Sequence, residues 1–234
     1  MRILAFDTST EFLSVCLLDS GATILRTLSG PLRHGANLAP LIAEVLQESG
    51  VAEISQVDLV ACPEGPGSFT GLRIGYATAK GLVAALQGHL PVVSVPTLEL
   101  HGWRRRSFPG AVMPILDARK GRFYTALFQN GRRLTEDLDY SAPELLSLLP
   151  QALPGRSPVL LTGYHAHLVQ ERLGSGLPEG WTIDAQGRAP TACDLAQRAL
   201  DLHREGKTLS QAAGPRYVRR SDAELTRGKS RESR

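Results

Sequence analysis

The pattern of apolar and polar positions in the first hundred residues predicts a regular series of strands and helices. Short β-prone apolar runs bounded by turn residues predict strands, and apolar residues that recur every three or four positions predict helices. The predicted strands are 2–6, 13–18, 22–28, 57–61 and 91–95, and the predicted helices are 36–48 and 68–86. Because tight links join the first three strands, we expect an antiparallel meander. The whole order is βββαβαβ.

From residue 111 onward the same patterns recur more loosely. The predicted strands are 111–116, 122–128, 132–139 and 159–162, and the predicted helices are 142–149 and 190–205. Asn130-Gly131 is a strong hairpin signal. The Pro/Gly-rich stretch 174–190 is expected to be a surface connection. We place a boundary near residue 100, which predicts a first domain at 1–100, a second at 101–218 and a tail at 219–234.

Composition excludes several classes of protein. With 42% hydrophobic and 21% charged residues among 234, the chain has enough apolar material for a core. No apolar run approaches the roughly 20 residues that span a bilayer, and Asp7 interrupts the first apolar run too early for a signal peptide. The three cysteines lie far apart in the sequence, which excludes a disulfide framework and argues against a zinc ribbon. We therefore expect a soluble, cytoplasmic protein.

The net charge of +3 is concentrated at the C-terminal end. Residues 219–234 contain six basic and three acidic side chains, so they carry the whole excess and the rest of the chain is balanced. A balanced body argues against a protein that mainly binds nucleic acid. Because the tail is also poor in apolar residues, we expect it to be disordered. A role in steering RNA stays open.

The segment Pro63–Arg73, with the sequence PEGPGSFTGLR, is the most informative motif. A Gly-rich turn before a helix exposes backbone N–H groups to an anion, which makes Gly67 and Ser68 candidate anion-binding residues. The glycine spacing, however, is one residue too long for a dinucleotide fingerprint, and no Lys-Ser or Lys-Thr pair follows. The alternative is a tight turn in which Ser68 caps the helix and Gly71 permits close packing.

Asp7 stands at the end of the first predicted strand and is followed by three hydroxyl residues. These groups suit a phosphate or a metal ion, or they complete a strand-ending turn in which hydroxyls bond the backbone. The six histidines include no HxxxH or HExxH pair, and His165 and His167 are expected on a strand or loop. We therefore predict no metal site.

Four motifs, taken together, point to a family. Residues 3–10 read ILAFDTST, residues 65–75 read GPGSFTGLRIG, and residues 115–121 read ILDARKG. Together with PRYVR at 215–219, these motifs resemble the bacterial TsaB (YeaZ-like) family of tRNA threonylcarbamoyladenosine biosynthesis subunits. The resemblance runs from residue 1 to about 219.

The resemblance implies an α/β, two-lobed actin/Hsp70-like (ASKHA) fold whose first lobe has the order βββαβαβ. It also implies a non-catalytic scaffold that pairs with the catalytic paralogue TsaD and with the ATPase TsaE in the complex that modifies tRNA next to the anticodon. The chain would contact tRNA only indirectly and form a homodimer when alone. ATP or ADP would bind only in the complex.

Two departures from active relatives accompany the resemblance. The catalytic paralogue holds a metal through an HxxxH pair after the strand that corresponds to 91–95, whereas here only His101 remains, with Thr97 and Arg105 four residues away. ASKHA enzymes also place a glycine-rich turn against the phosphates, where this chain has the bulky Arg119 and Lys120. We keep Asp7, Gly67, Ser68, Arg119 and Lys120 as possible anion-binding residues and predict no catalytic residue.

In the family, the two helices of the first lobe bind the equivalent pair of the paralogue or of a second copy. This resemblance makes eight residues candidate interface positions: His34, Leu38, Leu41, Ile42, Phe69, Arg73, Tyr76 and Lys80. Some of them are alternatively core residues. Three other functions stay open: an ASKHA-type ATPase or phosphotransferase that uses Asp7, a metallopeptidase-like protein, and a homodimeric binding module without an enzyme partner.

Overall fold

A computed structural model of the chain describes residues 1–20, 22–30, 33–152, 157–174, 176–184, 190–210 and 213–218. The predicted tail at 219–234 lies outside these residues. Among the described residues, no helix is both long and apolar enough to cross a membrane.

The first sheet contains five strands in the order β3-β2-β1-β4-β5. They are β1 (Ile3–Asp7), β2 (Phe12–Asp19), β3 (Ala22–Ser29), β4 (Leu59–Gly65) and β5 (Val92–Pro96). The first three strands pair antiparallel, which confirms the predicted meander, and β4 and β5 run parallel to β1. The carboxyl ends of β1, β4 and β5 therefore meet at one edge.

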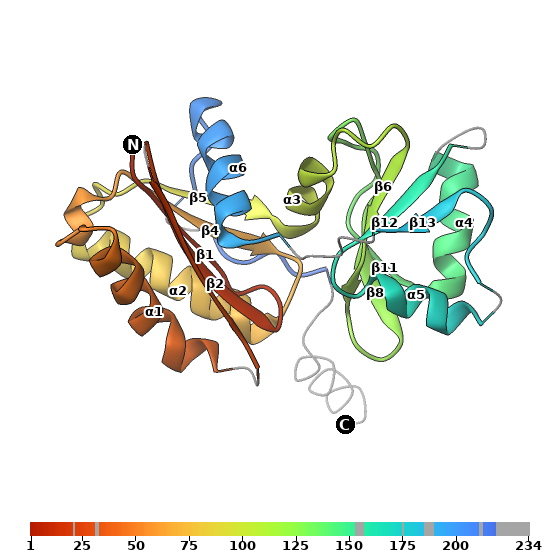
Figure 1. Cartoon of the computed structure of the whole chain (residues 1–234), viewed down its shortest axis with the longest axis horizontal. Helices are drawn as coiled ribbons and strands as arrows, with labels where there is room; N and C mark the ends of the chain where they lie inside the picture. Colours follow the sequence, from red (N-terminus) through yellow and green to blue (C-terminus); the bar gives the residue numbers. More distant parts are fainter. Residues whose placement is uncertain are drawn as a thin grey trace, which may run out of the picture.

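Helices cover both faces of this sheet (Figure 1). Alternate residues of a strand point to opposite faces, and here both faces are apolar. On one face, Leu13 and Val15 of β2 pack with α1 (His34–Glu48) and α2 (Phe69–Ala85). On the other, Cys16 packs with α6 (Ala192–Arg204). The two helices of the predicted βββαβαβ order thus share one side, and a helix from the far end of the chain covers the other.

The remaining strands form two further sheets. The second sheet has the order β10-β9-β6-β12-β13 and contains β6 (Ala111–Pro114), β9 (Phe128–Gln129), β10 (Arg132–Arg133), β12 (Val159–Thr162) and β13 (Trp181–Ile183). The third contains β7 (Leu116–Asp117), β8 (Arg122–Thr125) and β11 (Leu138–Ser141). Helices α4 (Ala142–Ala152) and α5 (Ala166–Leu173) pack against each other beside them. We call the first sheet with α1, α2 and α6 the first lobe, and the other two sheets with α4 and α5 the second lobe.

Several boundaries differ from the sequence prediction. The predicted strand 111–116 is divided between β6 and β7, which belong to different sheets. The predicted strand 132–139 is divided in the same way between β10 and β11. The predicted connection 174–190 contains β13, which pairs parallel with β12. An apolar run indicates which residues are buried, but it does not indicate which sheet they join.

Helix α3 (Thr97–Arg104), which the pattern did not predict, lies between the lobes (Figure 1). Leu100 is buried in the core shared by the first sheet and α6, and Leu98 is buried with Phe128 of the second lobe. This helix has only eight residues and carries apolar side chains on both of its sides. Its sequence therefore lacks the one-sided apolar period that predicts a helix. The predicted division near residue 100 stays a prediction, and α3 stands at that point.

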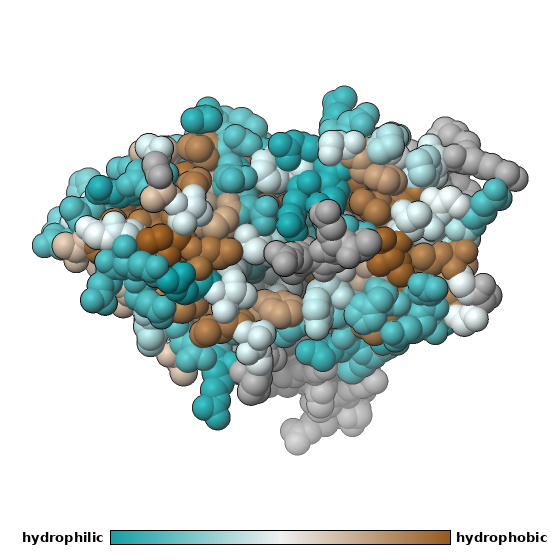
Figure 2. Space-filling model, in the orientation of Figure 1, coloured by the Kyte–Doolittle hydropathy of each residue, from teal (hydrophilic) through white to brown (hydrophobic). Residues whose placement is uncertain are grey.

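The short helix η1 (Ile54–Gln56) precedes β4. Figure 2, in the orientation of Figure 1, shows a largely hydrophilic surface with separate hydrophobic patches on the two lobes.

Candidate functional site

The glycines of the 63–73 segment hold the β1–β2 turn against the start of α2. A Cβ atom added to Gly67 would approach the Ser9 carbonyl oxygen within 3.0 Å, and one added to Gly71 would do the same to the Thr8 carbonyl oxygen. The Ser68 amide donates to the Ser9 carbonyl over 2.7 Å, and the Ser68 hydroxyl accepts from the Gly71 amide over 3.2 Å. The structure therefore contains the tight turn in which Ser68 caps α2. The amides of Ser68 and Gly71, which could have faced an anion, already donate hydrogen bonds within the chain.

Asp7 lies beneath this turn at the carboxyl end of β1. Its side chain is buried and accepts hydrogen bonds from the amide and the hydroxyl of Ser9, over 2.8 and 2.7 Å. Burial raises the pKa of Asp7, although these two bonds and nearby His34 oppose the rise. The structure thus brings together three predicted anion-binding residues, Asp7, Gly67 and Ser68, through Ser9.

The other two predicted anion-binding residues stand in the turn after β7. Arg119 and Lys120 both have left-handed backbone angles, with φ of 65° and 55°. Such angles are unfavourable for residues with a side chain. The Arg119 amide donates to the Asp117 carboxylate over 2.9 Å, and the Arg119 side chain is 75% exposed. The turn therefore presents exposed cationic side chains on the second lobe.

His165 connects this turn to the first lobe. Its Nδ1 accepts from the Asp117 amide over 3.2 Å, and its Nε2 lies 3.1 Å from a carboxylate oxygen of Glu11. Because Nδ1 accepts, the ring proton sits on Nε2 and donates to Glu11. Beside this contact, the rings of Phe12 and Tyr164 meet edge to face at 4.8 Å. Sequence reasoning missed this junction, because 154 positions separate Glu11 from His165.

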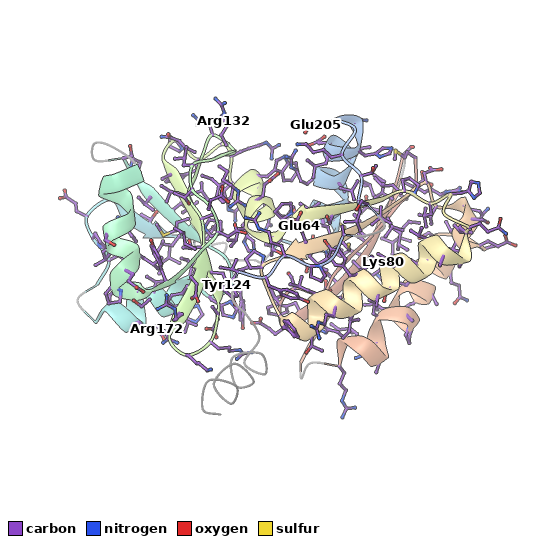
Figure 3. The ribbon with its side chains drawn as sticks, turned by 180° about the vertical axis from the view of Figure 1, so that it is seen from behind. Glu64, Lys80, Tyr124, Arg132, Arg172 and Glu205 are labelled. Carbon is purple, nitrogen blue, oxygen red and sulfur yellow. The ribbon has the colours of Figure 1, made fainter. Side chains whose placement is uncertain are left out.

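The C-terminal segment closes the other side of the loop. The Arg216 amide donates to the Glu64 carbonyl over 2.8 Å, and a Cβ atom added to Gly65 would collide with the Arg216 carbonyl. Glu64 itself lies between the two lobes (Figure 3), where burial raises the pKa of its carboxyl group. A negative charge on Glu64 would disfavour phosphate at this point, and the raised pKa lessens that charge.

A cavity of about 410 Å³ opens at the carboxyl ends of β4 and β5. Its lining includes Glu64, Tyr76, Ser94, Glu99 and Leu209. The Tyr76 side chain is buried, and burial raises the pKa of its hydroxyl group to about 12. Sequence reasoning missed this cavity because Leu209 comes from the segment after α6.

The eight predicted interface residues fall into two groups. Leu38, Leu41, Ile42 and Tyr76 are buried in the core between the first sheet and the helix pair, and His34 is buried with its Nε2 2.8 Å from the Thr10 carbonyl. These five residues therefore form the inner side of α1 and α2.

The other three lie on the outer side. Arg73 and Lys80 are exposed, and Phe69 is half-buried; Lys80 is marked on α2 in Figure 3. The Arg73 guanidinium stacks 3.8 Å above the Phe69 ring and donates to the Tyr217 hydroxyl over 3.2 Å. The rings of Phe69 and Tyr217 lie 4.7 Å apart. The outer side of α2 thus begins with a cation–aromatic cluster completed by the C-terminal segment.

Comparison of the sequence with known proteins gives two informative matches. The family model described as "TsaD: tRNA N6-adenosine threonylcarbamoyltransferase" matches residues 32–160. The tRNA threonylcarbamoyladenosine biosynthesis protein TsaB of Escherichia coli (strain K12) is 33% identical over 231 residues, which cover 95% of this chain and 96% of that protein.

Solved structures agree with the sequence comparison. YeaZ from Pseudomonas aeruginosa is 29% identical with a TM-score of 0.75, and the match covers 93% of this chain and 99% of that one. The activator of the 2-hydroxyisocaproyl-CoA dehydratase from Clostridium difficile, solved with bound ADPNP, has a TM-score of 0.53 at 13% identity and matches 90% of this chain and 100% of that one. This second similarity concerns the fold alone, and the predicted two-lobed ASKHA fold is confirmed. On the strength of the near full-length match, the chain belongs to the TsaB family of tRNA threonylcarbamoyladenosine biosynthesis proteins.

Proposed function

We propose that this chain takes part in forming threonylcarbamoyladenosine in tRNA as a non-catalytic subunit that binds and supports a TsaD-type catalytic paralogue. In this proposal a TsaE-type ATPase joins the complex, and tRNA contacts the chain indirectly. ATP or ADP binds only within the complex, and the chain alone forms a homodimer. The observation that carries the proposal is the outer surface of the α1–α2 pair.

Small residues dominate that outer surface. Ala36, Ala39 and Ala43 are exposed on α1, and Ala77, Gly81 and Ala84 are exposed on α2. Residues spaced three or four apart lie on one side of a helix. A Cβ atom added to Gly81 would meet nothing within 4 Å, so this part of α2 faces open space.

Such a surface favours helix-to-helix contact with a partner. Small side chains let a second pair of helices come close, and they lose little rotamer freedom when they are covered. Arg73 and Lys80, which flank Ala77 on the exposed side of α2, add charge that can select the partner. The buried residues Leu38, Leu41, Ile42 and Tyr76 support this surface from below.

A bulky cation in the middle of the surface tests the proposal. We expect the wild-type chain to form a 1:1 complex with the TsaD-type protein of the same organism, measured by size-exclusion chromatography with light scattering. Ala77→Arg should weaken that complex at least tenfold, because its side chain keeps the helices apart. Gln197→Arg is the matched control, since Gln197 is exposed on α6, on the opposite face of the sheet. Equal binding by both variants would contradict the proposal.

The rival function is an ATPase or phosphotransferase that uses Asp7, whose buried carboxyl group ends β1. Asp7→Asn preserves the shape of the side chain, so binding of this variant to the TsaD-type protein can be measured by the same chromatography. A non-catalytic subunit keeps its partner and the full activity of the assembled complex after this change. Nucleotide hydrolysis by the isolated wild-type chain that disappears in Asp7→Asn would favour the rival.

A further inference from the structure

The structure brings together two of the three cysteines. The Sγ atoms of Cys16 and Cys193 lie 2.6 Å apart, although the residues are 177 positions apart in the sequence. Cys16 belongs to β2 and points to the face that α6 covers, and Cys193 stands in the first turn of α6. Both sulfurs are present as thiols. The third cysteine, Cys62, is buried in the core on the opposite face of the same sheet.

The contact is held in place by its surroundings. Next to Cys193, the Ala192 amide donates to the Ser14 hydroxyl over 3.0 Å, so the first turn of α6 is fastened to β2. Thr191 and Asp194 form a capping box that fixes the start of the helix. Because both cysteines sit on regular elements rather than on loops, the two sulfurs are kept at bonding range by the fold.

The two thiols differ in access and in acidity. Cys16 is fully buried, whereas Cys193 is partly exposed. The hydrogen bond between them lowers the pKa of Cys193, and the same contact together with burial raises the pKa of Cys16. A thiolate is the reactive form of cysteine. An oxidant in solution therefore meets the more acidic and more accessible thiol first.

We propose that Cys16 and Cys193 are a redox-active pair that forms a reversible disulfide between β2 and α6 on exposure to a peroxide. In the first step the Cys193 thiolate attacks one peroxide oxygen and breaks the O–O bond. This step gives a sulfenic acid and releases water after proton transfer. In the second step the Cys16 sulfur attacks the sulfenic sulfur, the S–O bond breaks, and a second water leaves. Two thiols lose two electrons in total, and one hydrogen peroxide is reduced to two waters.

Free-thiol counting tests the pair directly on the full chain. The protein is treated with hydrogen peroxide, denatured in urea and alkylated with N-ethylmaleimide, and its intact mass is measured. We expect the number of alkylated cysteines to fall from three to one, and to return to three after dithiothreitol. Tryptic digestion of the oxidised protein should give one linked pair of peptides, residues 3–26 with residues 189–198, and leave the Cys62 peptide, residues 34–73, alkylated.

Single variants supply the controls. Cys62→Ser should still form the linked peptide, because burial keeps Cys62 outside the reaction and raises its pKa to about 12. Cys16→Ser and Cys193→Ser should each abolish it. A wild-type thiol count that stays at three, or addition of oxygen to Cys193 without any linked peptide, would overturn the proposal. The wild-type measurement decides even if a variant fails to fold, and it does not depend on the proposed function.

Discussion

His101 shows how much one buried side chain can contribute to the pH dependence of this protein. It lies on α3 between the lobes and is 2% exposed. Burial lowers its pKa to about 3, and the neighbouring Arg104 adds to the effect. The neutral ring is therefore the folded form throughout the physiological range. In the unfolded chain the ring takes up a proton near pH 6.5.

We predict that this difference destabilises the protein in mild acid. Because the folded pKa is depressed, the unfolded chain binds the extra proton below pH 6.5, and stability falls from there toward pH 3. Between pH 7.5 and pH 5 the wild type should lose about 2 kcal/mol more unfolding free energy than His101→Gln. Urea denaturation at several pH values measures this difference. His89→Gln, at an exposed histidine, should follow the wild type, and parallel curves for all three proteins would contradict the prediction.

At the scale of elements, α2 uses its glycines for two different purposes. Gly71 and Gly75 face Thr8, where an added Cβ atom would have no room. Gly81, in the same helix, faces open space. Close packing therefore requires glycine in the first two turns of α2. At Gly81, no contact among the described residues requires a small side chain.

Alanine substitutions should separate these purposes. Gly71→Ala is expected to lower the free energy of unfolding by about 1–3 kcal/mol, because its Cβ overlaps the Thr8 carbonyl and forces the turn to shift. Gly81→Ala is expected to raise it by about 0.5–1 kcal/mol, because alanine favours an exposed helix interior over glycine. Thermal or urea denaturation measures both. Loss of stability in Gly81→Ala would show that the outer side is constrained within the chain.

At the scale of the whole molecule, contacts from widely separated segments join the two lobes. Helix α3 contributes side chains to both cores. Glu11 meets His165, and the Arg216 side chain reaches the second lobe at Asp137, with 3.4 Å between Nε and the carboxylate. The same C-terminal segment holds the Glu64 carbonyl of the first lobe. The relative position of the lobes thus depends on residues from the start, the middle and the end of the chain.

The ring pair at this junction offers a test of coupling between the lobes. Phe12 comes from the first lobe and Tyr164 from the segment before α5. A double-mutant cycle with Phe12→Ala and Tyr164→Ala should give a coupling free energy of about 0.5–1.5 kcal/mol in urea denaturation. Tyr164 is 48% exposed, which places the expected value toward the lower end. Strictly additive effects would mean that the rings do not help to fix the two lobes.

The sequence alone determined the elements of the first lobe and the family. Local patterns of apolar residues predict strands that belong to a single sheet and the helices between them. The order βββαβαβ follows from these patterns. The motif at 65–75 pointed to the family, and its glycines occupy positions where close packing leaves little room for a side chain. Ser68 as a helix cap could be predicted for the same reason, since capping involves only residues three positions apart.

Only the tertiary structure decided which residues meet across the chain. It placed α6 on the first sheet, α3 between the lobes, and four of the predicted interface residues, Leu38, Leu41, Ile42 and Tyr76, in the core. It also brought Cys16 to Cys193 and Glu11 to His165. Periodicity records which side of an element is apolar, but a partner in the same chain and a partner in another chain bury an apolar side equally well. Distance in space is therefore set by packing of the whole chain, which no local pattern contains.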